Sequence, residues 1–380
     1  MTEQRIRGVR ALVDGAWVET DLGVRDGVLV EPTTLGPGAP VVAADGWRAA
    51  PGYVDLQCNG GFGIDLVREP ERLWELGALL PRFGVTAWLP TIVSAPDGIV
   101  ERAIAALAAG PPTGWSGAVP VALHLEGPFL SPAKRGAHPE ALLRPPTLEA
   151  VAGWSKARGV ALVTLAPDLP GALDAVDALV ERGVVVSLGH TPATAAQSIA
   201  AVDAGARWVT HLFNAMAPMH HREPGLAGVA LADERLRVGL IPDGVHVHPL
   251  VVALAQRALG ERLTIVTDAV GALGMPAGRP RLGQAEVTVG HDGVRLVDGT
   301  LAGSNLGMDQ GVRNLVAFSG CSPGAAVHAA STAPARLLGD LTRGRLALGA
   351  RADVVLLTDG LDLVSTLVAG EVAHDTGSSR

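Results

Sequence analysis

Three residues that are well suited to hold a metal ion follow separate apolar segments of the chain. Glu126 ends the segment VPVALHLE, His190 ends VVVSLGH and His211 ends RWVTH. One carboxylate and two imidazoles, with a fourth position open to water, form a catalytic zinc arrangement. A single histidine at a strand end is more often an ordinary hydrogen-bonding residue. The interpretation as a metal site therefore depends on all three residues converging in the fold.

Asp268, in the segment RLTIVTDAVGA, is a candidate proton carrier. An aspartate beside a metal-bound water can take its proton and later give it to a leaving group. The alternative is a helix N-cap or an aspartate that stabilises a loop. Glu126 is harder to explain in such terms, because it is expected to be partly buried and a buried carboxylate needs a partner or a metal ion.

Further polar residues lie at the ends of other apolar segments. Gln57 and Asn59 follow the first segment, and His246 lies in DGVHVHP after the seventh. Arg222, in the loop sequence HHREPGLAG, is suited to binding an anion, although it is also interpretable as an ordinary surface arginine. Cys58 is expected to be a small buried residue rather than a nucleophile or ligand.

The elements that must position these residues alternate between strand-length apolar runs and helix-length amphipathic segments. The runs are rich in Val, Leu and Ile without clean alternation, which is typical of strands buried on both faces. Eight such strand–helix units predict a (β/α)₈ TIM-like barrel, whose active site would lie at the carboxyl ends of the strands. A doubly wound sheet is the alternative. The predicted strands are 50–57, 86–93, 119–126, 160–165, 184–190, 207–211, 237–241 and 262–268.

Short strands with Asp-Gly turns occur at both ends of the chain. We expect residues 1–49 and 345–380 to form one small β-sandwich domain, and residues 50–344 to form the barrel. A hairpin insert is expected near 280–300. Two helices are predicted after this insert, near 309–320 and 324–339.

The composition excludes several classes of function. Hydrophobic residues make up 48% and charged residues 18% of the 380 positions, which argues against intrinsic disorder. A net charge of −8 offers no basic surface for nucleic acid. No apolar run is long enough for a membrane span, and no signal peptide is expected at the N-terminus. Two cysteines suit a reducing compartment, so a cytoplasmic protein is expected.

Eight segments of characteristic sequence follow one another along the chain. They are PGYVDLQCNGGFGIDL, HLEGPFLSPAKRGAH, SLGHTPAT, THLFNAM, HREPGLAG, DGVHVHP, VTDAVGALG and DGTLAGS. In this order they resemble segments of the N-acetylglucosamine-6-phosphate deacetylase family, within the amidohydrolase superfamily. The resemblance extends from about residue 45 to the C-terminal segment GARADVVLL, which marks only the superfamily.

The resemblance implies metal-dependent hydrolysis of the acetamide of N-acetylglucosamine 6-phosphate to glucosamine 6-phosphate and acetate. It implies that Asp268 is the catalytic acid and base, and that His138 polarises the acetyl carbonyl. Glu126, His190 and His211 would be the metal ligands. The residues implied to contact the sugar phosphate are Asn214, Ala215, Arg222 and His246. The resemblance also implies a homodimer, in which such contacts come from the neighbouring subunit.

One divalent ion per chain is expected, namely Zn²⁺, with Fe²⁺, Co²⁺ and Mn²⁺ as alternatives. Many amidohydrolases hold a second ion with a His-x-His after the first strand, where this chain has Gln57-Cys58-Asn59. Neutral amides are poor ligands for such an ion, which leaves Gln57 and Asn59 free to bind substrate or metal-bound water.

Three other functions remain open at this point. A different amidohydrolase would usually carry a carboxylated lysine or the His-x-His pair, and this chain has neither. A deacetylase for the galactosamine isomer differs only at the 4-hydroxyl of its substrate. A sugar-phosphate binding protein without catalysis would be expected to lose Asp268, which is present.

Overall fold

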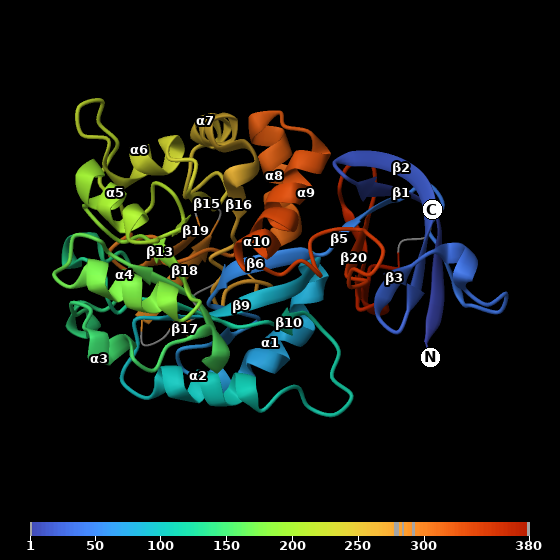
Figure 1. The fold of residues 1–380 in the computed structure, drawn as a ribbon, viewed down its shortest axis with the longest axis horizontal. Coiled ribbons are helices and arrows are strands. Elements are labelled where there is room, and N and C mark those ends of the chain that lie inside the picture. Colours follow the sequence, from blue (N-terminus) through green and yellow to red (C-terminus); the bar gives the residue numbers. More distant parts are fainter. Residues whose placement is uncertain (1, 277–280, 283–284, 291–292, 378–380) are drawn as a thin grey trace.

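The computed structural model describes residues 2–276, 281–282, 285–290 and 293–377. Two sheets organise this part of the chain. A parallel barrel surrounded by helices forms the larger body, and a sheet built from both chain ends lies beside it (Figure 1). The predicted fold class, a (β/α)₈ barrel with a small β unit from both termini, is confirmed.

The barrel strands coincide with the eight predicted segments. All of them pair in parallel, in the order β10-β9-β11-β12-β13-β14-β15-β16, with β6 also on β9. The third segment is divided into two short strands. The barrel strands are β6 (Tyr53–Cys58), β9 (Val85–Val93), β10 (Val119–Pro120), β11 (Leu123–Glu126), β12 (Val160–Leu165), β13 (Val185–Leu188), β14 (Trp208–Val209), β15 (Arg237–Leu240) and β16 (Leu263–Ile265).

Burial on both faces explains why these strands lack an alternating pattern. Every residue of β12, with the sequence VALVTL, is buried, and so is every residue of β6. Helices cover the outer face of the barrel and leave the inner face to the residues of the strands themselves (Figure 1). Val163 of β12 and Val176 of the following helix belong to the same buried cluster.

The surrounding helices follow the predicted amphipathic segments. Thr194 and Gln197 form a capping box at the start of α5, which explains where that helix begins. Among the described residues, no helix has the length and apolar character needed to cross a membrane. The helices are α1 (Leu73–Leu79), α2 (Ile99–Ala108), α3 (Leu148–Val151), α4 (Ala172–Glu181), α5 (Ala195–Asp203), α6 (Gly225–Ala232) and α7 (Pro249–Leu259).

Three helices follow the last barrel strand, where the sequence predicts two. The segment 308–319 forms α8 (Met308–Ser319), as expected. The segment predicted as one helix near 324–339 is divided into α9 (Pro323–Ala330) and α10 (Thr332–Leu337). Ser331 leaves the helical conformation between them, and Pro334 has no N–H to continue the hydrogen-bond pattern of α9. The prediction of one continuous helix is therefore wrong.

Backbone hydrogen bonds join the first and last barrel strands without a regular ladder. The N–H of Asp268 donates to the carbonyl of Gln57 (2.9 Å), and the N–H of Asn59 donates to the carbonyl of Ala269 (2.7 Å). Cys58 and Ala269 form an isolated parallel bridge at the same place. We call this junction between β6 and the segment after β16 the seam of the barrel.

The sheet from the two chain ends has eight strands, ordered β22-β21-β20-β5-β1-β2-β3 with β4 on β1. It has its own apolar core, which includes Ile6, Val9, Val354 and Leu356. Its strands are β1 (Glu3–Val13), β2 (Ala16–Arg25), β3 (Val28–Val30), β4 (Val41–Ala43), β5 (Arg48–Pro51), β20 (Val354–Leu357), β21 (Leu363–Val368) and β22 (Glu371–Asp375).

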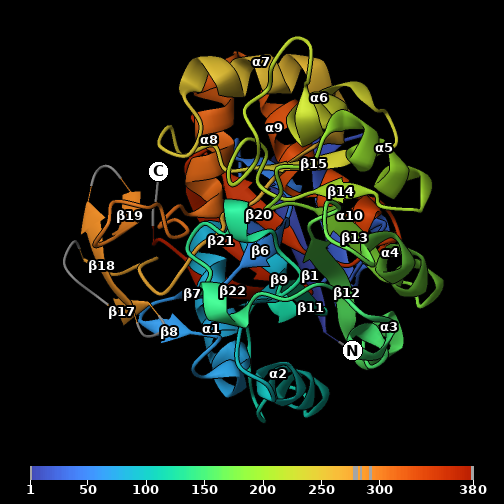
Figure 2. The same cartoon turned by 90° about the vertical axis from the view of Figure 1, so that its left-hand side faces the viewer.

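Small strands outside both sheets lie near the carboxyl ends of the barrel strands. In the region of the predicted hairpin insert, β18 (Ala285–Gly290) pairs antiparallel with β17 (Arg281–Leu282) and β19 (Gly293–Leu296) (Figure 2). Residues 277–280, 283–284 and 291–292 of this insert lie outside the described residues. Val287 and Val294 of the insert pack in one apolar cluster with Val270, which lies two residues after Asp268. Beside the seam, β7 (Gly60–Gly61) pairs with β8 (Ile64–Asp65).

Candidate active site

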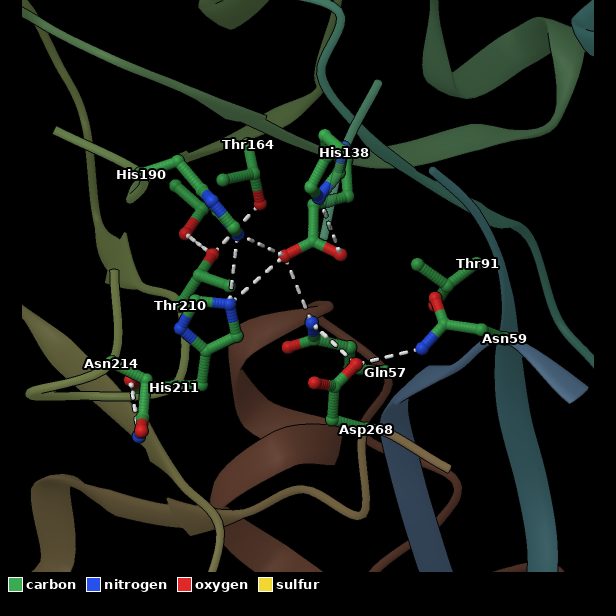
Figure 3. Close-up of polar contacts among 12 residues, drawn as sticks. Gln57, Asn59, Thr91, His138, Thr164, His190, Thr210, His211, Asn214 and Asp268 are labelled. Carbon is green, nitrogen blue, oxygen red and sulfur yellow. Dashed lines mark hydrogen bonds and ion pairs between the residues drawn. The ribbon is translucent and has the colours of Figure 1, made fainter. Parts of the chain in front are cut away.

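Glu126, His190 and His211 meet at the carboxyl ends of three barrel strands. Figure 3 shows the two imidazole rings of His190 and His211 next to each other. Oε1 of Glu126 lies 3.2 Å from Nε2 of His190 and 3.1 Å from Nε2 of His211. The two Nε2 atoms are 3.0 Å apart. All three side chains are buried. The structure thus brings together the three residues that the sequence suggested as metal ligands.

The protonation of His190 shows why this cluster suits a cation. Nδ1 of His190 lies 3.0 Å from the carbonyl oxygen of Lys134, which can only accept a hydrogen bond. Nδ1 must therefore carry the proton, and Nε2 of a neutral His190 directs a lone pair toward the Glu126 carboxylate. Lone pairs facing a carboxylate repel unless a proton or a cation lies among them. A ligand histidine held by a carbonyl at its other nitrogen is typical of metal sites.

The spacing of the three ligand atoms also fits an ion. Two ligand atoms on a tetrahedral zinc ion with bonds of about 2.0–2.1 Å are about 3.3–3.4 Å apart. The three observed separations lie between 3.0 and 3.2 Å. Burial by itself would raise the pKa of Glu126, but its interactions with the His190 and His211 rings outweigh burial and hold this pKa well below its usual range, so the carboxylate stays ionised.

His138 offers a second possible grouping around the same carboxylate. Ligand atoms of Glu126, His138 and His190 all lie within 4.8 Å of one another. Nε2 of His138, however, is 4.0 Å from Oε2 of Glu126, whereas His211 approaches Oε1 at 3.1 Å. The set with His211 is therefore the tighter one, and His138 lies beside it.

An unusual backbone conformation aims several of these side chains into the barrel. His190, His211 and Asp268 have φ values of 50°, 26° and 47°, in the left-handed region that residues other than glycine seldom adopt. Such conformations persist only where the surrounding structure holds them, and they are concentrated at functional sites. Each of these residues lies just beyond the end of its strand, where the chain turns over the barrel rim.

Asp268 lies beside this cluster and is held by two amides of the first strand. The side-chain nitrogens of Gln57 and Asn59 donate to Oδ1 of Asp268 at 3.1 Å and 2.7 Å (Figure 3). The Gln57 nitrogen also donates to Oε1 of Glu126 at 3.0 Å, so it bridges the two carboxylates. Burial, together with the charge of Glu126, raises the pKa of Asp268 above its usual value.

The amide oxygens of Gln57 and Asn59 are in a different situation from their nitrogens. Both oxygens are buried and have no hydrogen-bond partner among the described residues. The nitrogens of both side chains donate to carboxylates, so binding of a ligand by these residues, which stays a prediction, would use the oxygens. The oxygens are left as two buried acceptors for an N–H or O–H group.

His138 is held by Ser94, a residue that the sequence analysis did not select. The backbone N–H of Ser94 donates to Nδ1 of His138 (3.3 Å), and the Ser94 hydroxyl lies 2.9 Å from the same atom. Nδ1 is therefore an acceptor, so the proton of the neutral ring is on Nε2, toward Glu126. Burial lowers the pKa of His138 to about 3, which keeps the ring neutral. Ser94 directly follows β9, so the rule that selected other strand-end residues would have found it.

The remaining predicted residues are arranged less compactly. Asn214 lies near His211 and donates to the carbonyls of His211 and Leu212, and the carbonyl of Ala215 accepts from Thr191 (3.1 Å). Nδ1 of His246 lies 2.6 Å from Oδ2 of Asp243. The loop after Ala217 carries Arg222 at the surface, and the guanidinium of Arg222 forms no hydrogen bond or ion pair with any described residue.

Below the cluster of Glu126, His190 and His211, a chain of buried hydrogen bonds crosses the barrel. Nδ1 of His124 lies 3.1 Å from the carbonyl of Leu56, and its Nε2 lies 2.7 Å from the hydroxyl of Thr164. Thr164 contacts Thr210 at 2.7 Å (Figure 3). Single threonines inside apolar segments, Thr164 in VALVTL and Thr210 in RWVTH, are the sequence signal for this network. Cys58 is buried beside it in the apolar core, as expected, and burial keeps the pKa of its thiol well above the usual value.

A parallel barrel with a carboxylate, two imidazoles and a neighbouring aspartate at its carboxyl rim defines the general class of barrel hydrolases. The model of the amidohydrolase family matches residues 84–373 of this chain. The chain belongs to the amidohydrolase family.

Relatives of nearly the same length have related names. The human N-acetylglucosamine-6-phosphate deacetylase is 40% identical, over 98% of this chain and 95% of its own. The N-acetylgalactosamine-6-phosphate deacetylase of Escherichia coli O157:H7 is 39% identical, over 97% and 98% of the two chains.

Two solved structures show the same similarity in three dimensions. The N-acetylglucosamine-6-phosphate deacetylase of Thermotoga maritima superposes with a TM-score of 0.88 at 31% identity, covering 98% of this chain and all of its own. A mutant of the Mycobacterium smegmatis enzyme in complex with N-acetyl-D-glucosamine-6-phosphate has a TM-score of 0.87 at 34% identity, covering 98% and 99%.

Proposed function

We propose that this protein hydrolyses the acetamide of N-acetyl-D-glucosamine 6-phosphate to D-glucosamine 6-phosphate and acetate. The observation that carries the proposal is the position of Asp268, held by Gln57 next to the Glu126, His190 and His211 cluster. This arrangement places a proton carrier beside a site suited to a metal ion. The full-length similarity to named deacetylases gives the substrate.

Glu126, His190 and His211 would hold one divalent ion, which we propose to be Zn²⁺, with Fe²⁺, Co²⁺ and Mn²⁺ as alternatives. When bound, such an ion supplies Lewis acidity and makes water a better nucleophile near neutral pH. The tautomer of His190, fixed by the carbonyl of Lys134, presents the correct nitrogen for this purpose. Gln57 supports Glu126 from the other side.

Asp268 acts as the base and then as the acid. Both amide donors bind Oδ1, so Oδ2 is the oxygen that accepts the proton of the attacking water. Asp268 then gives this proton to the amine nitrogen as the C–N bond breaks, because an unprotonated amine leaves poorly. The raised pKa of Asp268 favours this second role, since it makes the protonated acid accessible nearer neutral pH.

His138 stabilises the oxygen of the acetyl group. Its Nε2–H, set by the hydrogen bond from Ser94 to Nδ1, donates to the carbonyl oxygen as negative charge develops there. A preorganised donor of this kind typically contributes a few kcal/mol, roughly 10²–10³ in rate. Because the ring stays neutral, His138 only donates a hydrogen bond to the substrate and does not compete with Asp268 as the acid.

The sugar phosphate is bound by residues around the rim. We assign Asn214, Ala215 and His246 to the sugar, and Arg222 to the phosphate. The unpaired oxygens of Gln57 and Asn59 accept hydrogen bonds from the substrate.

The exposed loop of Arg222 is free to reach a neighbouring chain, and we propose a homodimer in which it does so. We place the protein in the cytoplasm, where its two unpaired cysteines remain reduced.

Hydrolysis of N-acetyl-D-galactosamine 6-phosphate is the second candidate function. It is favoured by the relative of that name, whose 39% identity differs little from the 40% of the glucosamine enzymes. The two substrates differ only in the configuration of the 4-hydroxyl.

An acetate-release assay with both 6-phosphates and with unphosphorylated N-acetylglucosamine tests the proposal. We expect the highest kcat/KM for N-acetylglucosamine 6-phosphate and poor turnover without the phosphate. A preference for the galactosamine isomer would establish the second candidate instead. Comparable rates on all three sugars would reject a phosphosugar deacetylase.

A further inference from the structure

Asp55 is a buried carboxylate that the mechanism above does not use. It lies in β6, is 1% exposed, and is two residues away from Gln57 in the same strand. Its Oδ2 accepts from the hydroxyl of Thr267 at 2.5 Å. Its Oδ1 accepts from the backbone N–H of Gln57 (3.2 Å) and of Thr267 (3.3 Å). The structure thus gives this carboxylate no ordinary ion-pair partner but three donors from two chain segments.

These bonds cross the seam of the barrel at the level of Asp268. Thr267 directly precedes Asp268, and Gln57 is one of the two residues whose amides hold the Asp268 carboxylate. Because no regular strand ladder joins β6 to β16, Asp55 supplies side-chain contacts where backbone pairing is sparse. One side of the seam carries the donors to Asp268, and the other side carries Asp268 itself.

Ser304 holds the same segment from the opposite side. Its hydroxyl donates to the carbonyl of Thr267 (2.5 Å), and its backbone N–H donates to the carbonyl of Asp268 (2.8 Å). Asp268 has the left-handed φ of 47° between these two attachments. A conformation of this kind costs of order 1–3 kcal/mol and persists only where neighbours fix it.

We propose that Asp55 and Thr267 are positioning residues for the deacetylation, which hold the Asp268 carboxylate in register with Gln57 and the Glu126 cluster. This inference rests on the proposed function. Neither residue forms a hydrogen bond or ion pair with Glu126, His190 or His211, and both are buried beneath the rim. Their loss should therefore alter proton transfer by Asp268 while leaving substrate binding and the metal ligands in place.

Thr267→Val and Thr267→Ser form a matched pair for the test. Valine nearly keeps the shape of threonine but removes the hydroxyl, whereas serine keeps the hydroxyl. We expect Thr267→Val to lower kcat at least about 10-fold, since a misplacement of about 1 Å costs up to about 10²-fold. KM and bound metal should change less than about twofold in either variant, and Thr267→Ser should retain most of the turnover.

Because Thr267→Val removes the hydroxyl donor to Oδ2 of the buried Asp55 carboxylate and leaves only the two backbone donors to Oδ1, its folding is checked by circular dichroism and thermal unfolding. If it does not fold, Ser304→Ala replaces it, since that change removes the hydroxyl's bond to the carbonyl of Thr267, together with its bond from the backbone N–H of Leu306, and leaves Asp55 untouched. An unchanged kcat in a folded Thr267→Val or Ser304→Ala protein would overturn the inference. So would a Thr267→Ser protein that is as impaired as Thr267→Val.

The wild-type rate separates this inference from the proposed function. A wild-type protein that hydrolyses one of the sugar phosphates, together with a fully active Thr267→Val, contradicts only the positioning role. A wild-type protein without turnover on any of them contradicts both. A loss confined to kcat in Thr267→Val, with serine restoring it, supports both.

Discussion

Asn59 and Asp268 lie 209 positions apart in the chain, yet the amide nitrogen of Asn59 donates to Oδ1 of Asp268 over 2.7 Å. Gln57 donates to the same oxygen from the same strand. Two neutral amides thus occupy one oxygen of the carboxylate and leave the other for chemistry. The two residues at the positions compared above with a His-x-His pair thus orient Asp268, the residue that we propose as the proton carrier.

Replacing Asp268 by asparagine should abolish most turnover and leave the metal site intact. Asparagine keeps the size of the side chain but cannot accept and return a proton. Because one positioned acid–base residue contributes roughly 10²–10⁴-fold, kcat should fall by at least about 10²-fold. Steady-state kinetics and metal analysis check this, with the exposed Asp174→Asn as the control. Near-normal turnover would reject the acid–base role.

Removal of one imidazole should release the ion. His211→Ala deletes a ligand 3.1 Å from Glu126, so metal affinity should fall by more than the roughly 10–100-fold typical for a residue that only supports a ligand. Elemental analysis after dialysis, with activity measured in parallel, gives the result. His374→Ala, in the terminal sheet, should keep the ion. Equal metal content in the two variants would contradict the ligand assignment.

A single ion should suffice for full activity. A second ion would need the imidazoles of a His-x-His pair, and this chain has Gln57 and Asn59 at those positions. The side-chain nitrogens of these two residues donate hydrogen bonds to carboxylates. Chelated protein titrated with Zn²⁺ should regain full activity at about one equivalent per chain. Activity that rises only with a second equivalent would show that two ions are needed.

Arg222 should matter only for the phosphorylated sugar. A hydrogen bond to a charged group contributes about 1.5–3 kcal/mol, so Arg222→Ala should raise KM for the 6-phosphate roughly 10- to 100-fold. The slow rate on unphosphorylated N-acetylglucosamine should hardly change. Arg257→Ala, on the exposed face of α7, is the control. If both substrates are affected equally, Arg222 has a structural role.

Asp55 should make stability depend on pH in a defined direction. Burial raises the pKa of Asp55 from 3.8 to about 7. Between about pH 4 and pH 7 the folded state therefore keeps a proton on Asp55 that the unfolded state releases. The stabilisation from this proton is complete below about pH 4 and is lost as the pH rises to about 7. The free energy of unfolding of metal-free wild type, minus that of Asp55→Asn, should therefore decrease over this interval in urea titrations. A flat or rising difference would falsify this assignment.

The sequence by itself was sufficient to locate the barrel and its rim. Each strand is a local run of apolar residues, and the residue that ends it is visible without knowledge of any partner. Glu126, His190, His211 and Asp268 were found in this way, because parallel strands of one barrel end at a common rim. The eight predicted segments all became strands.

Only the tertiary structure decided which atoms of those residues meet. The bonds from Gln57 and Asn59 to Asp268, and from Ser94 to His138, depend on closure of the barrel and on left-handed turns at His190, His211 and Asp268. The break between α9 and α10, by contrast, has a local cause, because Pro334 has no N–H to continue the hydrogen-bond pattern of α9. Apolar periodicity is a local property of the chain, whereas these hydrogen bonds join residues up to about 200 positions apart, whose approach is fixed by packing of the whole domain.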